Sequence, residues 1–386
     1  MERVMKIFYN VEPFTAKRSG IPVFALNLVK NIKKLVPDAE ICSGAKTINP
    51  QIFWRLRKRM EEKFDFPIHF SFTFYPTYLQ WPEFVIKRIR KKASDYDIIH
   101  ILSNILSPSA SFTSWDNLVL SIHDGYIFHD EMFPKMFPWQ KYMVREMPKQ
   151  SSLAKKIITG SEYSKKEIVH YCRIPGDKIH VIPDATQWED GFPVQIDPEF
   201  FSSSGIIPNQ YFLSVGVLRP NKNYPSLLAG YTEYRKSSSF RGEKLVVVGS
   251  HEYPEIAEQL LHTEGVVSIP TVPLQTLKML YQNAKGFFIV SHMEGFGIPL
   301  LEAMQQGCPA CYARGTAMDE IGRDAAFSIP SPTDISAIAG MFERFSKGGN
   351  DIGKSVENCL KIAKEYSWEN TARKTLEVYR QIIEER

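Results

Sequence analysis

The sequence predicts an α/β fold with two doubly wound domains, each built around a parallel sheet. The chain has 386 residues, more than a single hydrophobic core normally holds together. Short apolar runs alternate with amphipathic stretches in both halves, as expected for strand and helix units around a parallel sheet. Between the halves, residues 183–208 are rich in Pro, Gly, Ser and acids, a composition typical of a linker.

The first half begins with an apolar run at residues 5–9, which predicts a buried strand. A helix is expected to follow at Ser19-Gly20-Ile21-Pro22, because Ser19 can cap it and proline is tolerated in a first turn. The other elements expected in this half are strands at 98–102, 118–122, 156–159 and 179–182 and helices at 137–149 and 164–171.

The second half repeats the alternation. Its expected strands lie at 211–215, 245–248, 266–269, 286–290 and 309–312, and its expected helices at 225–234, 256–262, 274–284 and 299–307. In open parallel sheets, ligands bind beyond the carboxyl ends of the strands. We therefore look for functional residues at those ends and expect a cleft between two facing domains.

Composition and charge exclude several classes of protein. Apolar residues make up 44% of the chain and charged residues 23%, unlike disordered, collagen-like or coiled-coil chains. The net charge of +4 is small for a nucleic-acid coat. Five scattered cysteines suggest no disulfide framework, and Cys308 and Cys311 are expected to be buried small residues. With no signal peptide or membrane span recognisable, a cytoplasmic protein is expected.

The segment richest in chemical groups is 291–304, directly after the strand expected at 286–290. Gly295 and Gly297 allow backbone amides to approach a ligand closely. A helix that begins at Pro299 presents unpaired amides and a positive dipole end, which suit an anion.

Two carboxylates, Glu294 and Glu302, flank the start of this helix. One precedes the helix and the other lies about one turn inside it, so both can address the same bound molecule. The alternative interpretation is that Glu302 is a solvated or capping acid and that the glycines form a tight turn.

A second segment, 214–223, joins a predicted strand to the next helix and carries Arg219 and Lys222. Two cations at a strand end suit a diphosphate, and each charge-assisted hydrogen bond contributes about 1.5–3 kcal/mol. A solvated, charged loop is the alternative. The chain has neither a Walker loop nor a Gly-x-Gly-x-x-Gly turn after the first strand, which disfavours a nicotinamide or flavin enzyme.

A third candidate is His123, where the strand expected at 118–122 ends in His-Asp. This position puts an imidazole at the carboxyl edge of the first sheet, where it can bond a substrate hydroxyl. A structural histidine is the alternative interpretation.

Together these segments resemble family 4 of the retaining glycosyltransferases, which have the GT-B fold of two facing Rossmann-like domains. Residues 294–304 resemble the family's signature of two glutamates separated by seven residues. Ser19-Gly20-Ile21 resembles its glycine loop, Ile122-His123-Asp124 its first-domain histidine motif, and residues 215–223 its phosphate-binding loop. Residues 366–369 resemble the bend before a last helix.

The resemblance covers most of the chain and implies its domain organisation. The implied parts are an N-terminal acceptor-binding domain over 1–190, a linker over 191–209, a C-terminal nucleotide-sugar-binding domain over 210–366, and a helix over 367–386 that crosses back to the N-terminal domain.

The activity that the resemblance implies is transfer of a hexose from a nucleotide sugar to a hydroxyl of a glycan or lipid-linked acceptor, in surface polysaccharide or glycolipid synthesis. The transfer keeps the anomeric configuration and uses no cofactor and no metal. Arg219 and Lys222 then neutralise the leaving diphosphate, and groups aimed at developing charge stabilise the transition state. His123 and Glu294 are expected at the transferred sugar.

The donor-binding residues that the resemblance implies are Gly20 and Gly216 near the phosphates, Thr271 and Val272 near the base, Glu302 at the ribose, and Gly295, Phe296, Gly297 and Ile298 along the sugar-binding loop. Two positions depart from the family pattern. The usual glycine pair is Ser19-Gly20 here, and the arginine that many relatives place before the lysine is Asn221.

Residues 51–92 concentrate the positive charge, with ten basic and four acidic residues and a net charge of +6, whereas the rest of the chain carries −2. The segment also holds many of the aromatic residues. A basic, aromatic segment is what a peripheral enzyme needs to contact an anionic membrane that carries a lipid-linked acceptor. The alternative is that the aromatics are core and the charges a solvated face.

For the donor we favour GDP-mannose, because residues 294–304 and the His-Asp motif most resemble the mannosyltransferase branch. A UDP-hexose-dependent transferase of the same fold is the first alternative, and a non-transferring GT-B protein such as a nucleotide-sugar epimerase is the second. A nucleic-acid binder is disfavoured, because nothing resembles a known binding module and paired glutamates repel phosphates.

Overall fold

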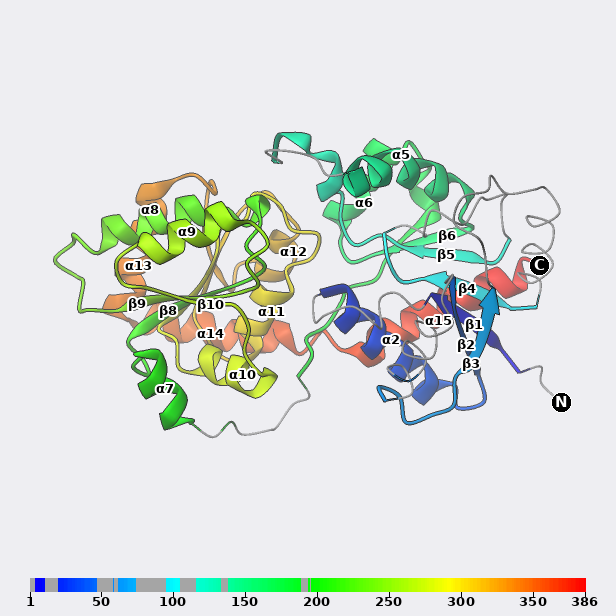
Figure 1. The fold of residues 1–386 in the computed structure, drawn as a ribbon, viewed down its shortest axis with the longest axis horizontal. Coiled ribbons are helices and arrows are strands. Elements are labelled where there is room, and N and C mark those ends of the chain that lie inside the picture. Colours follow the sequence, from blue (N-terminus) through cyan, green and yellow to red (C-terminus); the bar gives the residue numbers. More distant parts are fainter. Residues whose placement is uncertain are drawn as a thin grey trace. The chain divides into compact units, whose positions relative to one another are not determined.

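The structure is a computed structural model, which describes residues 4–10, 20–46, 58, 62–73, 95–104, 116–132, 138–188, 194 and 196–386. It consists of two compact units (Figure 1). Unit 1 comprises Met1–Asp130, Pro134–Gln187 and Ser367–Arg386, and unit 2 comprises Glu131–Phe133 and Trp188–Tyr366. Each unit is an α/β structure around one parallel sheet, which confirms the predicted fold class.

Unit 1 has a seven-stranded sheet in the order β3-β2-β1-β4-β5-β6-β7, in which every pair is parallel. The strands are β1 (Lys6–Asn10), β2 (Glu40–Lys46), β3 (His69–Thr73), β4 (Ile98–Ile101), β5 (Leu118–Ser121), β6 (Lys156–Thr159) and β7 (Ile179–Val181). Its helices are α2 (Gly20–Leu35), η1 (Tyr126–Phe128), α5 (Pro138–Leu153), α6 (Glu162–Cys172), η3 (Gly176–Lys178) and α15 (Trp368–Glu384), and η2 (Asp130–Met132) lies at the boundary between the two units.

Unit 2 has a six-stranded parallel sheet in the order β10-β9-β8-β11-β12-β13. The strands are β8 (Tyr211–Val215), β9 (Lys244–Val248), β10 (Val266–Ile269), β11 (Gly286–Ile289), β12 (Ala310–Ala313) and β13 (Phe327–Ile329). The helices are α7 (Pro198–Ser204), η4 (Pro220–Lys222), α8 (Tyr224–Tyr234), α9 (Pro254–His262), α10 (Leu274–Gln282), α11 (Ile298–Gln305), α12 (Met318–Gly322), α13 (Ile335–Lys347) and α14 (Asn350–Ala363).

Helices cover both faces of the unit 2 sheet. Successive core residues of β8 and β11 alternate between two apolar clusters, one shared with α8, α9 and α13 and the other with α10, α11 and α14. Figure 1 shows α8, α9 and α13 on one side of the strands and α10 and α14 on the other. Because helices cover both faces, most of the strands are largely apolar runs, and such runs predicted every strand of this sheet except β13.

The structure departs from the expected linker over 191–209, because residues 198–204 form α7. Asp197 caps this helix by accepting from the amide of Phe200, and Gly205 ends it in a left-handed conformation with φ of 64°. Phe201 is buried in the unit 2 core. The Pro, Gly and Ser that resembled a linker are therefore partly the cap residues of a short helix.

The last helix, α15, packs against α2 in unit 1, and its buried side chains belong to the unit 1 core. The Trp368 indole donates to the carbonyl of Thr186 at 2.7 Å. Tyr379 joins α15 to the sheet, since its hydroxyl lies 2.6 Å from His100 Nδ1. The other ring nitrogen, Nε2, lies 2.8 Å from the hydroxyl of Ser121 on β5. His100 is thus a fully buried, doubly hydrogen-bonded link between the C-terminal helix and two strands.

We expect unit 1 to lose stability as the pH is lowered from about 7 to about 5. Burial lowers the pKa of His100 from 6.5 to about 3. Between these values the unfolded chain binds a proton that the folded chain does not, so His100 alone should cost about 2 kcal/mol of unfolding free energy at pH 5. Urea unfolding at the two pH values measures the loss. It should be smaller in His100→Asn, and an undiminished loss would contradict this role.

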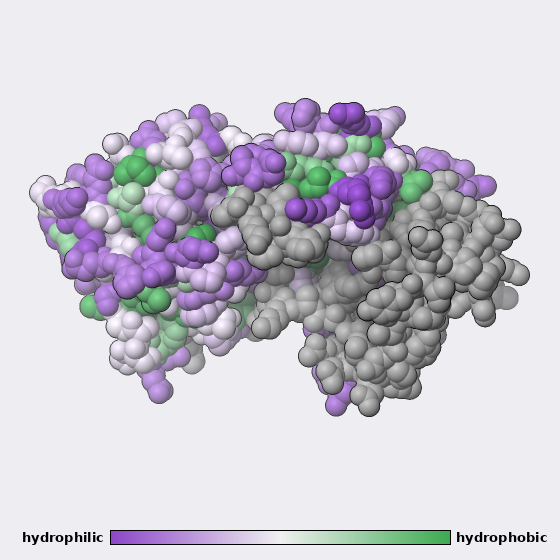
Figure 2. Space-filling view, turned by 45° about the horizontal axis from the view of Figure 1, so that its top comes forward, coloured by the Kyte–Doolittle hydropathy of each residue, from purple (hydrophilic) through white to green (hydrophobic). Residues whose placement is uncertain are grey.

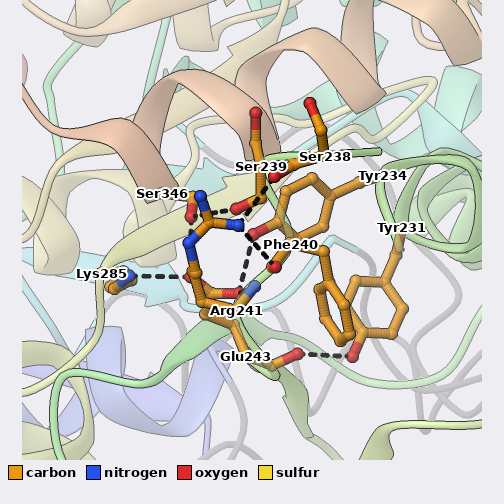
Figure 3. A network of polar contacts seen from close by, with 9 residues as sticks. All are labelled: Tyr231, Tyr234, Ser238, Ser239, Phe240, Arg241, Glu243, Lys285 and Ser346. Atoms are coloured by element: carbon orange, nitrogen blue, oxygen red, sulfur yellow. Dashed lines mark hydrogen bonds and ion pairs between the residues drawn. The ribbon is translucent and has the colours of Figure 1, made fainter. Parts of the chain in front are cut away.

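A second buried polar network ties the amino-terminal edge of the unit 2 sheet to its helices (Figure 3). Glu243, just before β9, accepts from the ammonium of Lys285 at 2.8 Å, the hydroxyl of Ser346 at 2.7 Å and the hydroxyl of Tyr234 at 2.8 Å. The amide of Arg241 also donates to it, at 2.8 Å. Burial alone raises the pKa of Glu243, but these donors outweigh burial and lower it to about 2.

The surface of the described residues is mixed. Figure 2 shows hydrophilic areas over most of the coloured surface, with small hydrophobic areas between them. The exposed large apolar side chains among the described residues are Val4, Leu35, Ile196, Ile207 and Leu261, and isolated side chains of this kind are normal. In the part of the chain that the structure describes, no helix combines the length and the apolar character needed to cross a membrane.

Candidate active site

The loops that follow two neighbouring strands, β8 and β11, meet at the carboxyl edge of the unit 2 sheet. After β8 the chain forms the phosphate loop, residues 216–223, and after β11 it forms the glutamate loop, residues 290–297. Gly297 ends the second loop with φ of 108°, a conformation that favours glycine, and α11 follows with proline in its first turn. The loop that leads into α11 therefore contacts the phosphate loop, through Met293 and Glu294.

Lys222 and Glu294 form the centre of this site. The ammonium of Lys222 lies 2.6 Å from Glu294 Oε1, and the side chains are 16% and 10% exposed. The hydroxyl of Ser291 donates to the same oxygen at 2.6 Å. The structure thus brings together two residues predicted 72 positions apart, and it adds Ser291, which sequence reasoning did not assign a role.

Two asparagines hold the phosphate loop against the glutamate loop. The side-chain amide of Asn221 donates to the backbone carbonyl of Met293 at 3.2 Å, and the backbone carbonyl of Asn221 accepts from the backbone amide of His292 at 2.8 Å. Asn223 adopts a left-handed conformation and donates to the carbonyls of Val290 and Pro332 at 3.2 and 2.6 Å. Asn221 therefore has a scaffolding role here.

Arg219 is paired with a different carboxylate, that of Glu252. Its guanidinium makes a two-pronged ion pair with Glu252, at 2.7 and 3.1 Å, and both side chains are more than 40% exposed. Glu252 follows β9, whose loop packs tightly on the phosphate loop: a methyl group on Gly249 would lie 1.8 Å from the carbonyl oxygen of Gly216. Sequence reasoning missed Glu252, although its place just after a predicted strand was a usable signal.

Glu302, on α11, is buried, and Tyr281 on α10 donates a hydrogen bond to its Oε2 at 3.1 Å. Thr271 and Val272 follow β10, at the same edge of the sheet but two strands away from β8. Thr271 is exposed and Val272 is half-buried against the core. The carboxyl edge of unit 2 therefore carries every predicted site residue from 216 to 302.

The sugar-binding loop itself contains both open and buried positions. Gly295 and Ile298 are half-buried, whereas Phe296 and Gly297 are buried. The Phe296 ring packs against Tyr366 with centroids 5.8 Å apart. Phe296 therefore anchors the loop in unit 2, and we assign its side chain a packing contact.

The two predicted residues of the first domain, His123 and Gly20, lie in unit 1. His123 follows β5, and its Nε2 lies 3.2 Å from the carbonyl of Leu102. A carbonyl only accepts, so Nε2 carries the proton and Nδ1 is left as an acceptor. Burial lowers the pKa of His123 to about 4, although the bond to Leu102 opposes this. Gly20 begins α2, and a methyl group there would meet nothing within 4 Å.

The cysteines and metal-ligating groups carry no further site within the described residues. All five cysteines are buried and free, including Cys308 and Cys311. No group of three or more His, Cys, Asp or Glu side chains that could hold a metal ion occurs among the residues that the structure describes.

Comparison with known proteins identifies both halves of the chain. Residues 18–186 match the model for "Glycosyltransferase Family 4", and residues 197–366 match that for "Glycosyl transferases group 1". O-antigen chain mannosyltransferase B of Escherichia coli is 26% identical over 97% of this chain and 100% of its own. O-antigen chain mannosyltransferase RfbU of Salmonella typhimurium is 26% identical over 56% of this chain and 58% of its own.

Among solved structures, Anabaena HepE in complex with UDP and glucose superposes with a TM-score of 0.68 at 16% identity, covering 98% of this chain and 100% of that one. The fold is therefore GT-B, and the protein is a glycosyltransferase. It belongs to the family 4 glycosyltransferases and is similar to their mannosyltransferases.

Proposed function

We propose that the protein is a retaining, metal-independent mannosyltransferase that moves mannose from GDP-mannose to a hydroxyl of a glycan or lipid-linked acceptor in surface polysaccharide synthesis. The observation that carries the proposal is the contact between Lys222 and Glu294 in the loops just before α11. The ammonium of Lys222 suits a phosphate and the carboxylate of Glu294 suits sugar hydroxyls, and the two groups lie side by side at the carboxyl edge of the unit 2 sheet.

In the proposed mechanism Lys222 leaves Glu294 when the donor binds and turns to the diphosphate. The positive charge of Lys222 and the positive dipole end of α11 then oppose the negative charge that grows on the leaving diphosphate, which is the part a metal ion plays in other transferases. Glu294, released from Lys222, accepts from hydroxyls of the transferred sugar. Glu302 accepts from the ribose.

His123 supports the proposal from unit 1. Its Nδ1 is an acceptor and its ring is neutral near pH 7, because burial keeps its pKa at about 4. A neutral acceptor of this kind suits a sugar hydroxyl.

The test is a transfer assay with the purified protein. GDP-mannose, GDP-fucose, UDP-glucose and UDP-galactose are offered with and without EDTA, and donor hydrolysis is followed when no acceptor is present. We expect GDP-mannose to be consumed fastest, EDTA to have no effect, and nuclear magnetic resonance of the product to show an α-mannoside. Consumption of none of these donors would contradict the proposal.

A UDP-hexose is the second candidate donor. It is favoured by the likeness to the HepE structure, which contains UDP and glucose and aligns with nearly the whole chain. Faster turnover of a UDP-sugar than of GDP-mannose would establish this alternative.

Membrane contact through residues 51–92 stays a prediction, because most of this segment lies outside the described residues. In its described part, Phe64 is buried in the unit 1 core and contacts Phe66 at 5.1 Å, so one of its aromatics is a core residue. We expect the protein to float with vesicles of anionic lipid at low salt and to be released at high salt, because each cation near the surface contributes about 1 kcal/mol. Absence of flotation would exclude the contact.

A further inference from the structure

Two buried hydroxyl groups lie against the two carboxylates of the glutamate signature. The hydroxyl of Ser291 is 2.6 Å from Glu294 Oε1, and that of Tyr281 is 3.1 Å from Glu302 Oε2. An ionised carboxylate only accepts, so in both pairs the hydroxyl donates. Ser291 and Tyr281 are fully buried, and neither belongs to the residues expected to bind substrate.

We propose that Ser291 and Tyr281 are positioning residues, one for each carboxylate: Ser291 aims Glu294 at the transferred sugar, and Tyr281 aims Glu302 at the ribose. The inference rests on the proposed function, which assigns these two ligand groups. It adds that the carboxylate for the sugar and the carboxylate for the ribose are each positioned by a different side chain of unit 2.

Ser291 and Lys222 share one acceptor, the carboxylate of Glu294. Lys222 and Ser291 donate to the same oxygen of Glu294, Oε1, and within the described part of the chain Oε2 accepts no hydrogen bond. Lys222 has a flexible four-carbon stem and its charge is needed by the diphosphate. Ser291 has a one-carbon side chain that is fixed where β11 ends. When Lys222 moves to the donor, Ser291 stays and keeps Oε1 occupied, so that Oε2 remains directed at the sugar.

The side chain of Tyr281 is fixed by packing in the unit 2 core. Its ring packs edge-on against Trp188, with centroids 5.6 Å apart, and lies tilted against Phe287, with centroids 5.4 Å apart. Its hydroxyl can also reach the carbonyl of Pro299 at 3.4 Å, a longer contact on the same helix, α11. Burial raises the pKa of Tyr281 well above its ordinary value, so the group remains a neutral donor. The position of Glu302 Oε2 is therefore set by α10 through Tyr281.

Binding measurements on the full chain separate the two roles. Ser291→Ala and Tyr281→Phe each remove one hydroxyl, and calorimetry gives the Kd of GDP and of GDP-mannose, or of UDP and UDP-glucose if the wild type prefers them. Ser291→Ala should weaken binding of the nucleotide sugar about tenfold and leave binding of the nucleoside diphosphate unchanged. Tyr281→Phe should weaken both about tenfold.

Double variants test whether each hydroxyl acts through its carboxylate. Ser291→Ala should have no further effect in a Glu294→Gln background, and Tyr281→Phe none in a Glu302→Gln background. Ser291→Thr, which keeps a hydroxyl, should restore nucleotide-sugar binding and so separates positioning from packing.

Three results would overturn the inference: equal losses for diphosphate and nucleotide sugar in Ser291→Ala, additive losses in the double variants, or no loss in Tyr281→Phe. Each of these leaves the proposed function standing, because the wild type still binds and transfers. A wild type that binds neither nucleotide sugar overturns the proposed function and the inference together.

Discussion

Replacing Lys222 by alanine should lower kcat about 100- to 1,000-fold, the range found when one preorganised group that stabilises a transition state is removed. Lys222 is the cation that contacts Glu294 at the end of α11, so its loss removes positive charge where the leaving diphosphate is expected. Steady-state kinetics with the preferred nucleotide sugar measures the effect, and calorimetry of the nucleoside diphosphate shows how much of it is binding.

The matched control is Lys236→Ala, which removes an exposed lysine that lies beyond the end of α8, at the other edge of unit 2. It should leave kcat unchanged. Arg219→Ala should have a smaller effect than Lys222→Ala, because the Arg219 guanidinium is already neutralised by Glu252. A wild-type kcat in Lys222→Ala would remove Lys222 from the mechanism, and a larger loss in Arg219→Ala would reverse the order of the two cations.

Replacing Glu243 by glutamine should lower the unfolding free energy of unit 2 by about 3 kcal/mol, because it leaves the ammonium of Lys285 without a buried counter-charge. The carboxylate is 1% exposed and accepts four hydrogen bonds. Urea unfolding at neutral pH measures the loss. The folded pKa of about 2 lies below the ordinary 4.5, so the advantage of the wild type is complete above about pH 4.5 and disappears as the pH falls towards 2.

Glu264→Gln is the control for this variant. Glu264 is paired with Arg235 but is 84% exposed, and pairs at the surface contribute little. We expect unfolding of Glu264→Gln to match the wild type. If the two variants lost the same unfolding free energy, or if Glu243→Gln lost none, burial of the Glu243 network would not explain its contribution to stability.

How far the sequence determines this structure depends on the range of the interactions. The strands at 156–159, 211–215 and 266–269 were predicted with their actual bounds, because continuous apolar runs are a local signal. β2 was missed because Ser43 and Gly44 interrupt its apolar pattern. α13 was also missed, although its buried Ile338, Phe342 and Phe345 have helical spacing and could have predicted it.

The same distinction holds in the site. Lys222, Glu294 and Glu302 were predicted because each sits in a local motif at a strand end. The partners Glu252, Ser291 and Tyr281 were missed as partners, although Ser291 lies three residues from Glu294, because which atoms meet depends on side-chain geometry. The pair between Arg219 and Glu252 spans 33 positions and two loops. No local pattern shows that Arg219 has a carboxylate partner.

The division of the chain between the units sets an order of events during synthesis. Unit 1 includes Ser367–Arg386, which follow unit 2 in the chain, whereas unit 2, apart from Glu131–Phe133, is the continuous stretch Trp188–Tyr366. Domains generally fold as units while the chain emerges, the amino-terminal one first. Here α15 follows unit 2 in the chain, so the unit 1 core to which its side chains belong can be completed only after unit 2 has been synthesised. The unit whose synthesis begins first is therefore completed after the other, and removal of Ser367–Arg386 is expected to destabilise the amino-terminal sheet.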